Sequence, residues 1–227
     1  MVLKTPSAPS KASKSGRSQI DPGALEIVGT LRGRGHRAFL AGGCVRDWLM
    51  GRNAVDWDIA TDAEPEMVRG YFDRTIEVGK QFGVVVVVLE HGQYEVARFR
   101  RDGPYRDGRR PEKVEFGEVH EDASRRDFTI NGLFYDPCED ELLDHVGGQA
   151  DIRRRLVRSI GNPRDRLSED YLRMLRAVRF ASRLGVDIHE DTFAAIREKA
   201  PEITRISSER VRDELTLILT AENPGRG

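Results

Sequence analysis

Cysteines and long apolar runs are both scarce in this sequence of 227 residues, and each scarcity excludes a class of protein. The two cysteines, Cys44 and Cys138, are too few and too far apart for a disulfide framework or a zinc site. The longest apolar run, at residues 84–89, has the length of a strand and cannot span a membrane. We therefore expect a globular protein of the reducing cytoplasm, with no membrane-spanning segment.

The N-terminal segment also lacks an apolar core. Its basic residues lie among Ser, Ala and Pro, and no apolar h-region follows them, so it is not a secretory signal peptide. Lysine predominates and no amphipathic face is evident, which disfavours an organelle presequence. We expect residues 1–20 to form a disordered basic tail.

The net charge of −1 conceals strong local patterning. Ten arginines stand against four acidic residues at 151–183, and seven basic residues stand against three acidic ones at 98–113. Basic strips within a nearly neutral protein indicate ligands that carry phosphate. A set of solvated helix faces is the alternative, so the pattern needs support from specific residues.

The spacing of apolar and turn residues predicts an α/β (α+β) fold. A mixed helix and strand pattern extends to about Asp151, and the pattern after it is entirely helical. We expect a head domain with a small mixed sheet at 21–152 and a helical region at 153–227. The expected elements of the head are a helix from Asp21 to Gly33, a strand at 38–41, a helix at 45–50, a strand at 55–60, a helix capped by Thr61, and a hairpin formed by 84–89 and 93–99.

Two aspartates are the strongest candidates for a metal site. Asp56 and Asp58 alternate with apolar Val55, Trp57 and Ile59 in the expected strand. Both carboxylates would then point to one face, with Cα atoms roughly 7 Å apart. Carboxylates this close repel unless a cation lies between them, and hard oxygen ligands suit Mg²⁺. An exposed polar strand face is the alternative.

A glycine pair, Gly42 and Gly43, lies between the expected strand at 38–41 and the helix that follows it. A strand that runs through a glycine turn into a helix presents N–H donors and a positive dipole end to an anion. Arg46, in the first helical turn, would add a bidentate phosphate contact. A plain turn is the alternative, and the nearby Asp56 favours the phosphate interpretation.

Carboxylates that hold metal beside a phosphate site indicate phosphoryl transfer. One Mg²⁺ would lower the pKa of an attacking hydroxyl, and another would hold a triphosphate and stabilise the departing pyrophosphate. Glu95, in the second strand of the expected hairpin, is a candidate third carboxylate. An edge-strand glutamate without a special role is the alternative.

The segment 124–131 supplies three further candidates. Arg126 would reach a phosphate, and Asp127 or Asn131 would hold ribose hydroxyls. Helix capping and an ordinary charged turn are the alternative.

A long helix is predicted at 168–184, with Ser168 as N-cap and Gly185 as the C-terminal stop. Polar residues at three-residue spacing share one of its faces: Asp170, Arg173 and Arg176, continuing toward Arg179. A carboxylate beside a guanidinium presents acceptors and donors in one plane, which can read the Watson–Crick edge of a base. An exposed salt-bridge ladder is the alternative. The expected apolar stripe consists of Leu172, Leu175, Val178, Ala181 and Leu184.

Four motifs in this order resemble the class II nucleotidyltransferases, which comprise tRNA CCA-adding enzymes and bacterial poly(A) polymerases. The motifs are residues 40–47, 56–58, 125–131 and 169–180, and residues 144–151 resemble the flexible segment between head and neck in that family. The resemblance implies a polymerase-β-like head followed by a helical neck.

The resemblance also implies a role for each matching residue. It implies that Gly43 and Arg46 contact the triphosphate and that Asp56 and Asp58 bind Mg²⁺. It implies that Arg126 contacts the incoming nucleotide. The residues implied to form the base-reading pocket are Asp170, Arg173, Arg176 and Arg179.

The implied activity is Mg²⁺-dependent transfer of CMP and AMP from CTP and ATP to the 3′ end of tRNA, with release of pyrophosphate. Residues 79–83 resemble the CCA-adding type, and the loop at 101–111 resembles the one needed to add the terminal A, which disfavours CC-only addition. Poly(A) or A-only addition stays open. A non-catalytic nucleotide- or RNA-binding module is the alternative outside enzymes, and the intact Asp56 and Asp58 argue against it.

Members of the family usually continue into body and tail domains that grip the tRNA, whereas this sequence stops just after a stretch at 206–215 that resembles the end of the neck. Either the chain is a fragment, or its tRNA recognition is supplied in some other way. We therefore expect the chain to bind nucleotide but to bind tRNA weakly by itself. The sequence predicts no particular oligomeric state.

Overall fold

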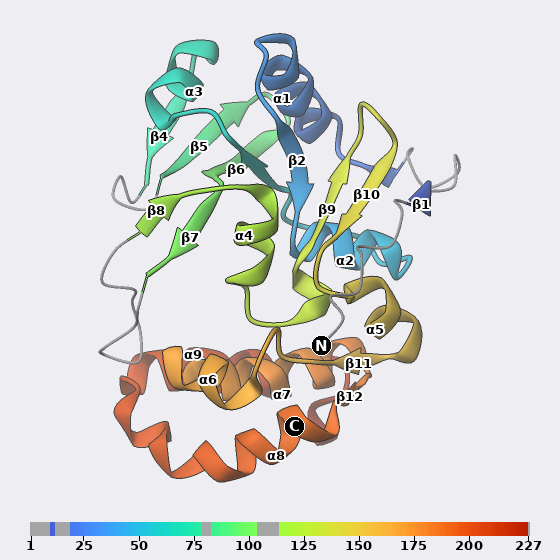
Figure 1. Ribbon diagram of the computed structural model, residues 1–227, viewed down its shortest axis with the longest axis vertical. Coiled ribbons are helices and arrows are strands. Elements are labelled where there is room, and N and C mark those ends of the chain that lie inside the picture. The colour runs from blue at the N-terminus through green and yellow to red at the C-terminus, as the bar shows by residue number, and fades with distance from the viewer. Residues whose placement is uncertain (1–9, 12–18, 79–82, 104–113, 227) are drawn as a thin grey trace, which may run out of the picture. The chain divides into compact units, whose positions relative to one another are not determined.

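The computed structural model describes residues 10–11, 19–78, 83–103 and 114–226 (Figure 1). The chain forms two compact units. The first contains the chain up to Arg101 together with Val114–Ala123 and Asn131–Val146, and the second contains Ser124–Ile130 and the chain from Gly147. The predicted boundary between residues 152 and 153 cuts through α5 (Gly148–Arg154) of the second unit. No helix in the described ranges is both long and apolar enough to cross a membrane.

An eight-stranded mixed sheet forms the first unit, in the order β1-β10-β9-β2-β3-β6-β5-β4 (Figure 1). The pairing of β3 with β6 is parallel, and the other pairings within this sheet are antiparallel. The mixed sheet confirms the predicted fold class. The strands are β1 (Ser10–Lys11), β2 (Ala38–Ala41), β3 (Asp58–Thr61), β4 (Thr75–Glu77), β5 (Val84–Leu89), β6 (Gly92–Arg98), β9 (Leu133–Asp136) and β10 (Glu141–Asp144).

Helix α1 (Pro22–Gly33) shows how the sequence sets an element boundary in this unit. Oδ1 of Asp21 accepts hydrogen bonds from the N–H groups of Gly23 and Ala24, at 2.8 and 3.1 Å. Pro22 follows at the first helical position, where its missing N–H costs nothing. The same Asp21 oxygen accepts the hydroxyl of Tyr94 from β6, which ties the helix end to the sheet.

The remaining elements up to residue 146 are short. They are α2 (Gly43–Leu49), α3 (Pro65–Tyr71), α4 (Val119–Ser124), the 3₁₀ helix η3 (Thr129–Asn131) and a separate two-stranded sheet of β7 (Arg100–Asp102) and β8 (Val114–Phe116).

Two predicted boundaries in the first unit were wrong. Strand β3 begins at Asp58, and Val55, which we expected to open it, is 82% exposed. Helix α3 begins at Pro65 rather than after Thr61. Thr61 belongs to β3, where its hydroxyl donates to the carbonyl of Arg37, so its backbone cannot also begin a helix.

The second unit is mainly helical, but the prediction of helices alone was wrong. Strands β11 (Leu156–Val157) and β12 (Asp187–Ile188) form a short parallel pair. The helices are α5, α6 (Pro163–Glu169), α7 (Leu172–Leu184), α8 (Glu190–Lys199), α9 (Ser208–Leu219), and the 3₁₀ helices η4 (Ala200–Arg205) and η5 (Pro224–Arg226).

The helix predicted at 168–184 is broken in two. Asp170 has φ −152° and ψ 106°, an extended conformation that separates α6 from α7. Its carboxylate accepts a hydrogen bond from the N–H of Leu172 and so caps α7. Gly185 ends α7 in the left-handed conformation, as predicted. The predicted apolar stripe was partly wrong, because Leu175 and Val178 are only half-buried and the buried face of α7 includes Met174, Ala177 and Phe180.

Several predictions fall on residues outside the described ranges. The motif at 79–83 and the loop at 101–111 lie almost wholly outside them, so both stay predictions. The predicted disordered tail is described only at residues 10–11 and 19–20. Ser10 and Lys11 pair with β10, and Ile20 is buried, so the tail prediction does not hold for these residues.

Candidate active site

The two candidate metal ligands lie where β3 begins. Trp57 and Ile59 are buried, Asp56 is exposed and Asp58 is half-buried, so both carboxylates lie on the side of the chain away from the core. The antiparallel register places Asp58 opposite Ala41, the last residue of β2. Gly42 follows Ala41 directly, so the structure brings Asp58 next to the glycine turn, as predicted.

The donor set fits Mg²⁺. Within the described ranges, no group of three or more His, Cys, Asp or Glu side chains is arranged to hold a metal ion. Mg²⁺ needs no such group, because in nucleotide-using enzymes it is bound by one or two carboxylates together with substrate phosphates and water. Asp56 and Asp58 meet that requirement.

Glu95 lies on the strand beside these carboxylates. Ile59 pairs with Val96 in the parallel register of β3 and β6, and both side chains are buried, so Glu95 and Asp58 share the opposite face. The expectation of an edge strand was wrong, because β6 lies between β3 and β5. Glu95 is exposed, and its catalytic role stays a prediction.

The glycine turn differs from the predicted phosphate site in one respect. Gly42 has φ 76°, in the left-handed region that a side chain would strain. Its N–H donates to the carbonyl of Leu133 at 2.9 Å. Gly42 therefore shapes the turn and joins it to β9, and any phosphate contact has to come from Gly43 onward.

Arg46 is 3% exposed and is held by two neighbours. Its Nε and Nη2 lie 2.8 and 2.7 Å from Oδ1 of Asp47, and its Nη1 donates to Oδ1 of Asn131 at 2.5 Å. The predictions gave Arg46 a phosphate and Asn131 a ribose hydroxyl, whereas the structure joins the two side chains to each other. Charge-assisted bonds of this kind are strong. They make Arg46 a buried clamp between α2 and Asn131 within the first unit.

Cys44 lies between Asp58 and the glycine turn, but it is no nucleophile. Burial, followed by the nearby Asp58, raises the pKa of its thiol to about 12. Its Sγ donates to the carbonyl of Ala41 at 3.2 Å. The thiol is therefore a protonated core group at neutral pH.

The second unit gathers most of the predicted base-reading residues. Asp127 is buried, and its Oδ2 accepts from Nε and Nη2 of Arg176 at 2.8 and 2.7 Å. Burial opposes the charge of Arg176, yet Asp127, Glu214 and Asp170 together raise its pKa above the ordinary value. Asp127 was predicted to hold a ribose hydroxyl; the structure makes it the partner of a base-reading candidate.

Helix α9 supplies two residues that the sequence predictions missed. Arg210 grips Asp170 through two contacts, Nη1 to Oδ1 at 3.3 Å and Nη2 to Oδ2 at 2.7 Å. Glu214 is buried and lies 2.8 Å from Nε of Arg179. Arg210 and Glu214 are four residues apart, the spacing that places two side chains on one helix face, and this spacing was the available signal.

Arg173 was predicted to face a base, but it is largely buried. Its Nη1 donates to the carbonyl of Arg166 at 2.8 Å and to Oε2 of Glu169 at 2.5 Å. Glu169 also accepts from Arg166 at 2.8 Å, so one carboxylate holds two arginines at the break between α6 and α7. Arg126 is half-buried and directly precedes Asp127.

These contacts fix the orientation of the donors and acceptors around Asp127. Among the base-reading candidates Arg176 keeps the most exposed side chain, at 34%, while those of Asp170 and Arg179 are 15% exposed. A guanidinium held in place by a buried carboxylate can present its remaining N–H groups in one plane. Such a plane suits the edge of a nucleotide base.

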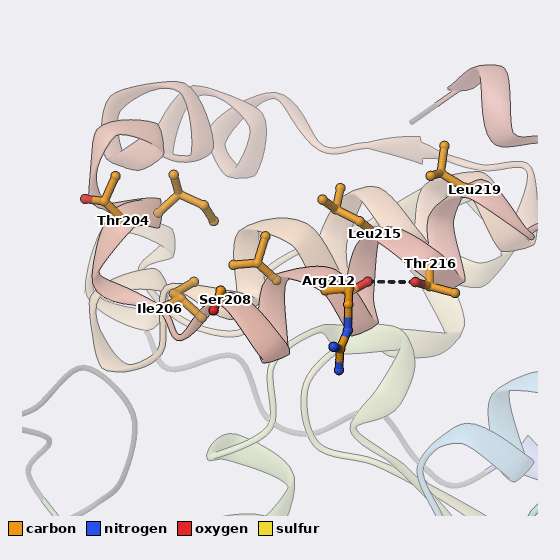
Figure 2. Close-up of a pocket in the computed structure, with 9 residues that line it drawn as sticks. Thr204, Ile206, Ser208, Arg212, Leu215, Thr216 and Leu219 are labelled. Atoms are coloured by element: carbon orange, nitrogen blue, oxygen red, sulfur yellow. Dashed lines mark hydrogen bonds between the residues drawn. The ribbon is translucent and has the colours of Figure 1, made fainter.

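An apolar groove lies elsewhere on the second unit, between η4 and α9, with a volume of about 550 Å³. Figure 2 shows Ile206 and Leu215 along it, with Arg212, Ser208 and Thr216 among its polar residues. None of the predicted site residues lines this groove. It is therefore not the candidate nucleotide site.

The chain belongs to the family described as the poly A polymerase head domain, whose model matches residues 38–158, more than half of the chain. The matched residues include the glycine turn, the paired aspartates and the segment around Asp127. A second model, described as "Probable RNA and SrmB- binding site of polymerase A", matches residues 185–227.

Known relatives carry a more specific name. The chain is 48% identical over 197 residues to the CCA-adding enzyme of Geobacillus kaustophilus, covering 86% of this chain and 48% of that protein. It is 43% identical over 197 residues to the CCA-adding enzyme of Bacillus subtilis, covering 86% of this chain and 49% of that protein. The chain thus spans about half the length of the curated relatives it matches.

The fold is also similar to that of a solved CCA-adding enzyme. The crystal structure of the Bacillus stearothermophilus CCA-adding enzyme in complex with CTP superposes with a TM-score of 0.79 at 42% identity. The match covers 88% of this chain and 49% of that one.

Proposed function

We propose that this chain is a template-independent RNA nucleotidyltransferase that adds CMP and AMP, from CTP and ATP, to the 3′ end of tRNA. The observation that carries the proposal is its similarity, at 42–48% identity, to CCA-adding enzymes across most of its length. The paired aspartates and the ion-paired cluster around Asp127 support it, since transfer needs a charge-neutralising site and selection needs oriented donors and acceptors.

The proposed chemistry starts from the first unit. Asp56 and Asp58 would hold Mg²⁺, which when bound neutralises phosphate charge and makes a hydroxyl a better nucleophile. The carboxylates orient the reacting groups, with Glu95 as a candidate third acid. Gly43 would face the triphosphate, and the clamp of Arg46 and Asn131 would keep the turn beside it rigid.

The second unit would select the base. Arg176 would present N–H donors to the base edge, oriented by Asp127, and Asp170 would present an acceptor, oriented by Arg210. Arg173 and Arg179 would stabilise this surface through their ion pairs with Glu169 and Glu214. Arg126 would contact the incoming nucleotide. No nucleic-acid template takes part in this selection.

The cellular site we propose is the cytoplasm, because the sequence has only two cysteines and they are widely separated, which is typical of proteins in a reducing compartment. A second candidate function is A-only or poly(A) addition. The family model that matches the head is named after poly A polymerase, and this supports the alternative.

Transfer of labelled CMP from CTP to a tRNA that lacks its terminal CCA tests the proposal. The wild-type chain should incorporate label in the presence of Mg²⁺. Asp56→Asn should lose about 10³-fold in rate, because losing a metal ligand removes several kcal/mol of transition-state stabilisation. Asp73→Asn is the matched control, since Asp73 is also exposed and lies outside the site. Equal rates for both variants would refute the assignment of the carboxylates.

A further inference from the structure

Most of the arginines of the second unit described above lie against carboxylates. Two more pairs of this kind are Arg158 with Asp151, at 3.0 Å, and Arg164 with Glu198, at 2.7 Å. Such pairing leaves little charge available for a ligand.

Arg153 and Arg154 differ from these arginines. They form the last turn of α5, both are exposed, and neither has an ion pair or a side-chain hydrogen bond with any residue in the described ranges. At 3.6 residues per turn, consecutive side chains are rotated by about 100° about the helix axis, so the two guanidinium groups point in different directions from the helix end. They form an exposed pair of cations with no ion-pair partner among the described residues.

Arg155 fixes this helix end against the segment that matches the RNA-binding family model. Its φ is 57°, a left-handed conformation that Asp140 alone among the other described non-glycine residues adopts. Its Nη2 donates to the carbonyl of Gly185 at 2.9 Å. Gly185 is the first residue of the segment at 185–227. The exposed cations of α5 therefore adjoin the start of that segment.

The helix dipole accounts for only part of this arrangement. Basic residues in a last turn stabilise the exposed carbonyls of the helix. Helix α5 has only seven residues, and stabilising its C-terminal carbonyls does not require two unpaired cations. Arg155 donates to the carbonyl of Gly185 at the end of α7 and not to its own helix.

We propose that Arg153 and Arg154 bind phosphate groups of the RNA acceptor, outside the nucleotide site, and extend the RNA-binding segment at 185–227 onto α5. The inference rests on the proposed function, which supplies RNA as the substrate. Arginine suits this task because its planar guanidinium binds phosphate oxygens bidentately. Contacts to phosphate position the RNA without reading its sequence, so this surface serves any acceptor.

The test is the salt dependence of tRNA binding by the full chain. Fluorescence anisotropy would give the affinity of the wild type and of the double variant Arg153→Gln with Arg154→Gln, from about 50 to 200 mM salt. The control is Arg34→Gln with Arg74→Gln, because these two arginines are also exposed, lie outside the segment at 185–227 and have no ion pair or side-chain hydrogen bond in the described ranges. Both double variants change charge equally.

The proposal predicts that the slope of log affinity against log salt shrinks in magnitude by about 1.5 in the first variant, since each lost phosphate contact removes about 0.7–0.9. The KM for tRNA rises, while kcat and the KM for CTP stay at wild-type values. Equal slopes for the two double variants, or no measurable tRNA binding by the wild type, would overturn the inference.

The two proposals fail separately in this experiment. A slope change specific to Arg153 and Arg154 without any nucleotide transfer by the wild type would retain the RNA surface and reject the proposed function. Nucleotide transfer by the wild type, with the same slope in both double variants, would retain the proposed function and reject the RNA surface.

Discussion

Replacing Glu214 with glutamine removes a negative charge that two arginines of α7 share. Its Oε2 lies 2.8 Å from Nε of Arg179, and its Oε1 lies 3.9 Å from Nη1 of Arg176. Glutamine keeps the shape of the side chain but not the charge. Arg176 would keep Asp127 as its partner, whereas Arg179 would lose the one carboxylate that it contacts within the described residues.

The expected loss of stability follows from burial. Burial lowers the pKa of Arg179, and Glu214 is the main group that offsets this effect. The Glu214 side chain is 9% exposed and that of Arg179 is 15% exposed, so water can compensate only in part. Breaking a fully buried pair by removing one partner costs about 3–5 kcal/mol. Because Arg179 keeps some exposure, we expect Glu214→Gln to lower the free energy of unfolding by about 2–3 kcal/mol.

The assay is urea unfolding followed by two probes. Both tryptophans, Trp48 and Trp57, belong to the first unit, so far-UV circular dichroism reports the helices of the second unit better than fluorescence does. We expect the circular dichroism midpoint to fall. Glu198→Gln is the matched control, because its exposed pair with Arg164 should contribute far less. A midpoint for Glu214→Gln as high as that of the control would refute the reasoning.

Two further predictions concern the first unit. Gly23→Ala should lower the free energy of unfolding by about 1–3 kcal/mol, because the new Cβ would lie 2.6 Å from Cζ of Tyr94. Gly29→Ala, in the same helix with nothing within 4 Å, should raise it by about 0.4–1 kcal/mol, and stabilisation by both changes in urea titrations would contradict the packing. At pH 8 the native chain should react with a thiol reagent at exposed Cys138 only, because burial raises the pKa of Cys44 to about 12. Modification of both cysteines before unfolding would count against this burial.

Local pattern predicted much of the first unit. The strand at 38–41 and the hairpin were confirmed because runs of apolar residues between turn residues define strands on their own. The sequence also predicted that the glycine turn lies next to Asp58, because only residues 44–57 separate them. Near Val55 and Thr61 the local sequence allows a strand or helix to begin at several residues. The pairing register with neighbouring strands determines where each element begins, and local sequence patterns do not show this register.

The second unit shows the opposite case. Periodicity placed Asp170 and Arg173 on one face of a continuous helix, but the chain breaks at Asp170. Asp170 turns to cap α7 and to accept from Arg210, forty residues later. Arg176 likewise donates to Asp127, forty-nine residues earlier. Partners that are distant in sequence fix the site, and a single sequence reveals them only as isolated charges.

The most direct test of the proposed function offers the chain three tRNAs, lacking CCA, CA or A at the 3′ end, with CTP alone, ATP alone or both, and then sequences the products. CCA addition predicts that CTP alone adds two C residues to the first tRNA and one to the second. It also predicts that ATP alone completes only the third and that the mixture restores CCA on all three. Runs of A added from ATP on every tRNA, or A added from ATP to the third tRNA with no C added to any tRNA from CTP, would contradict the assignment and favour poly(A) or A-only addition.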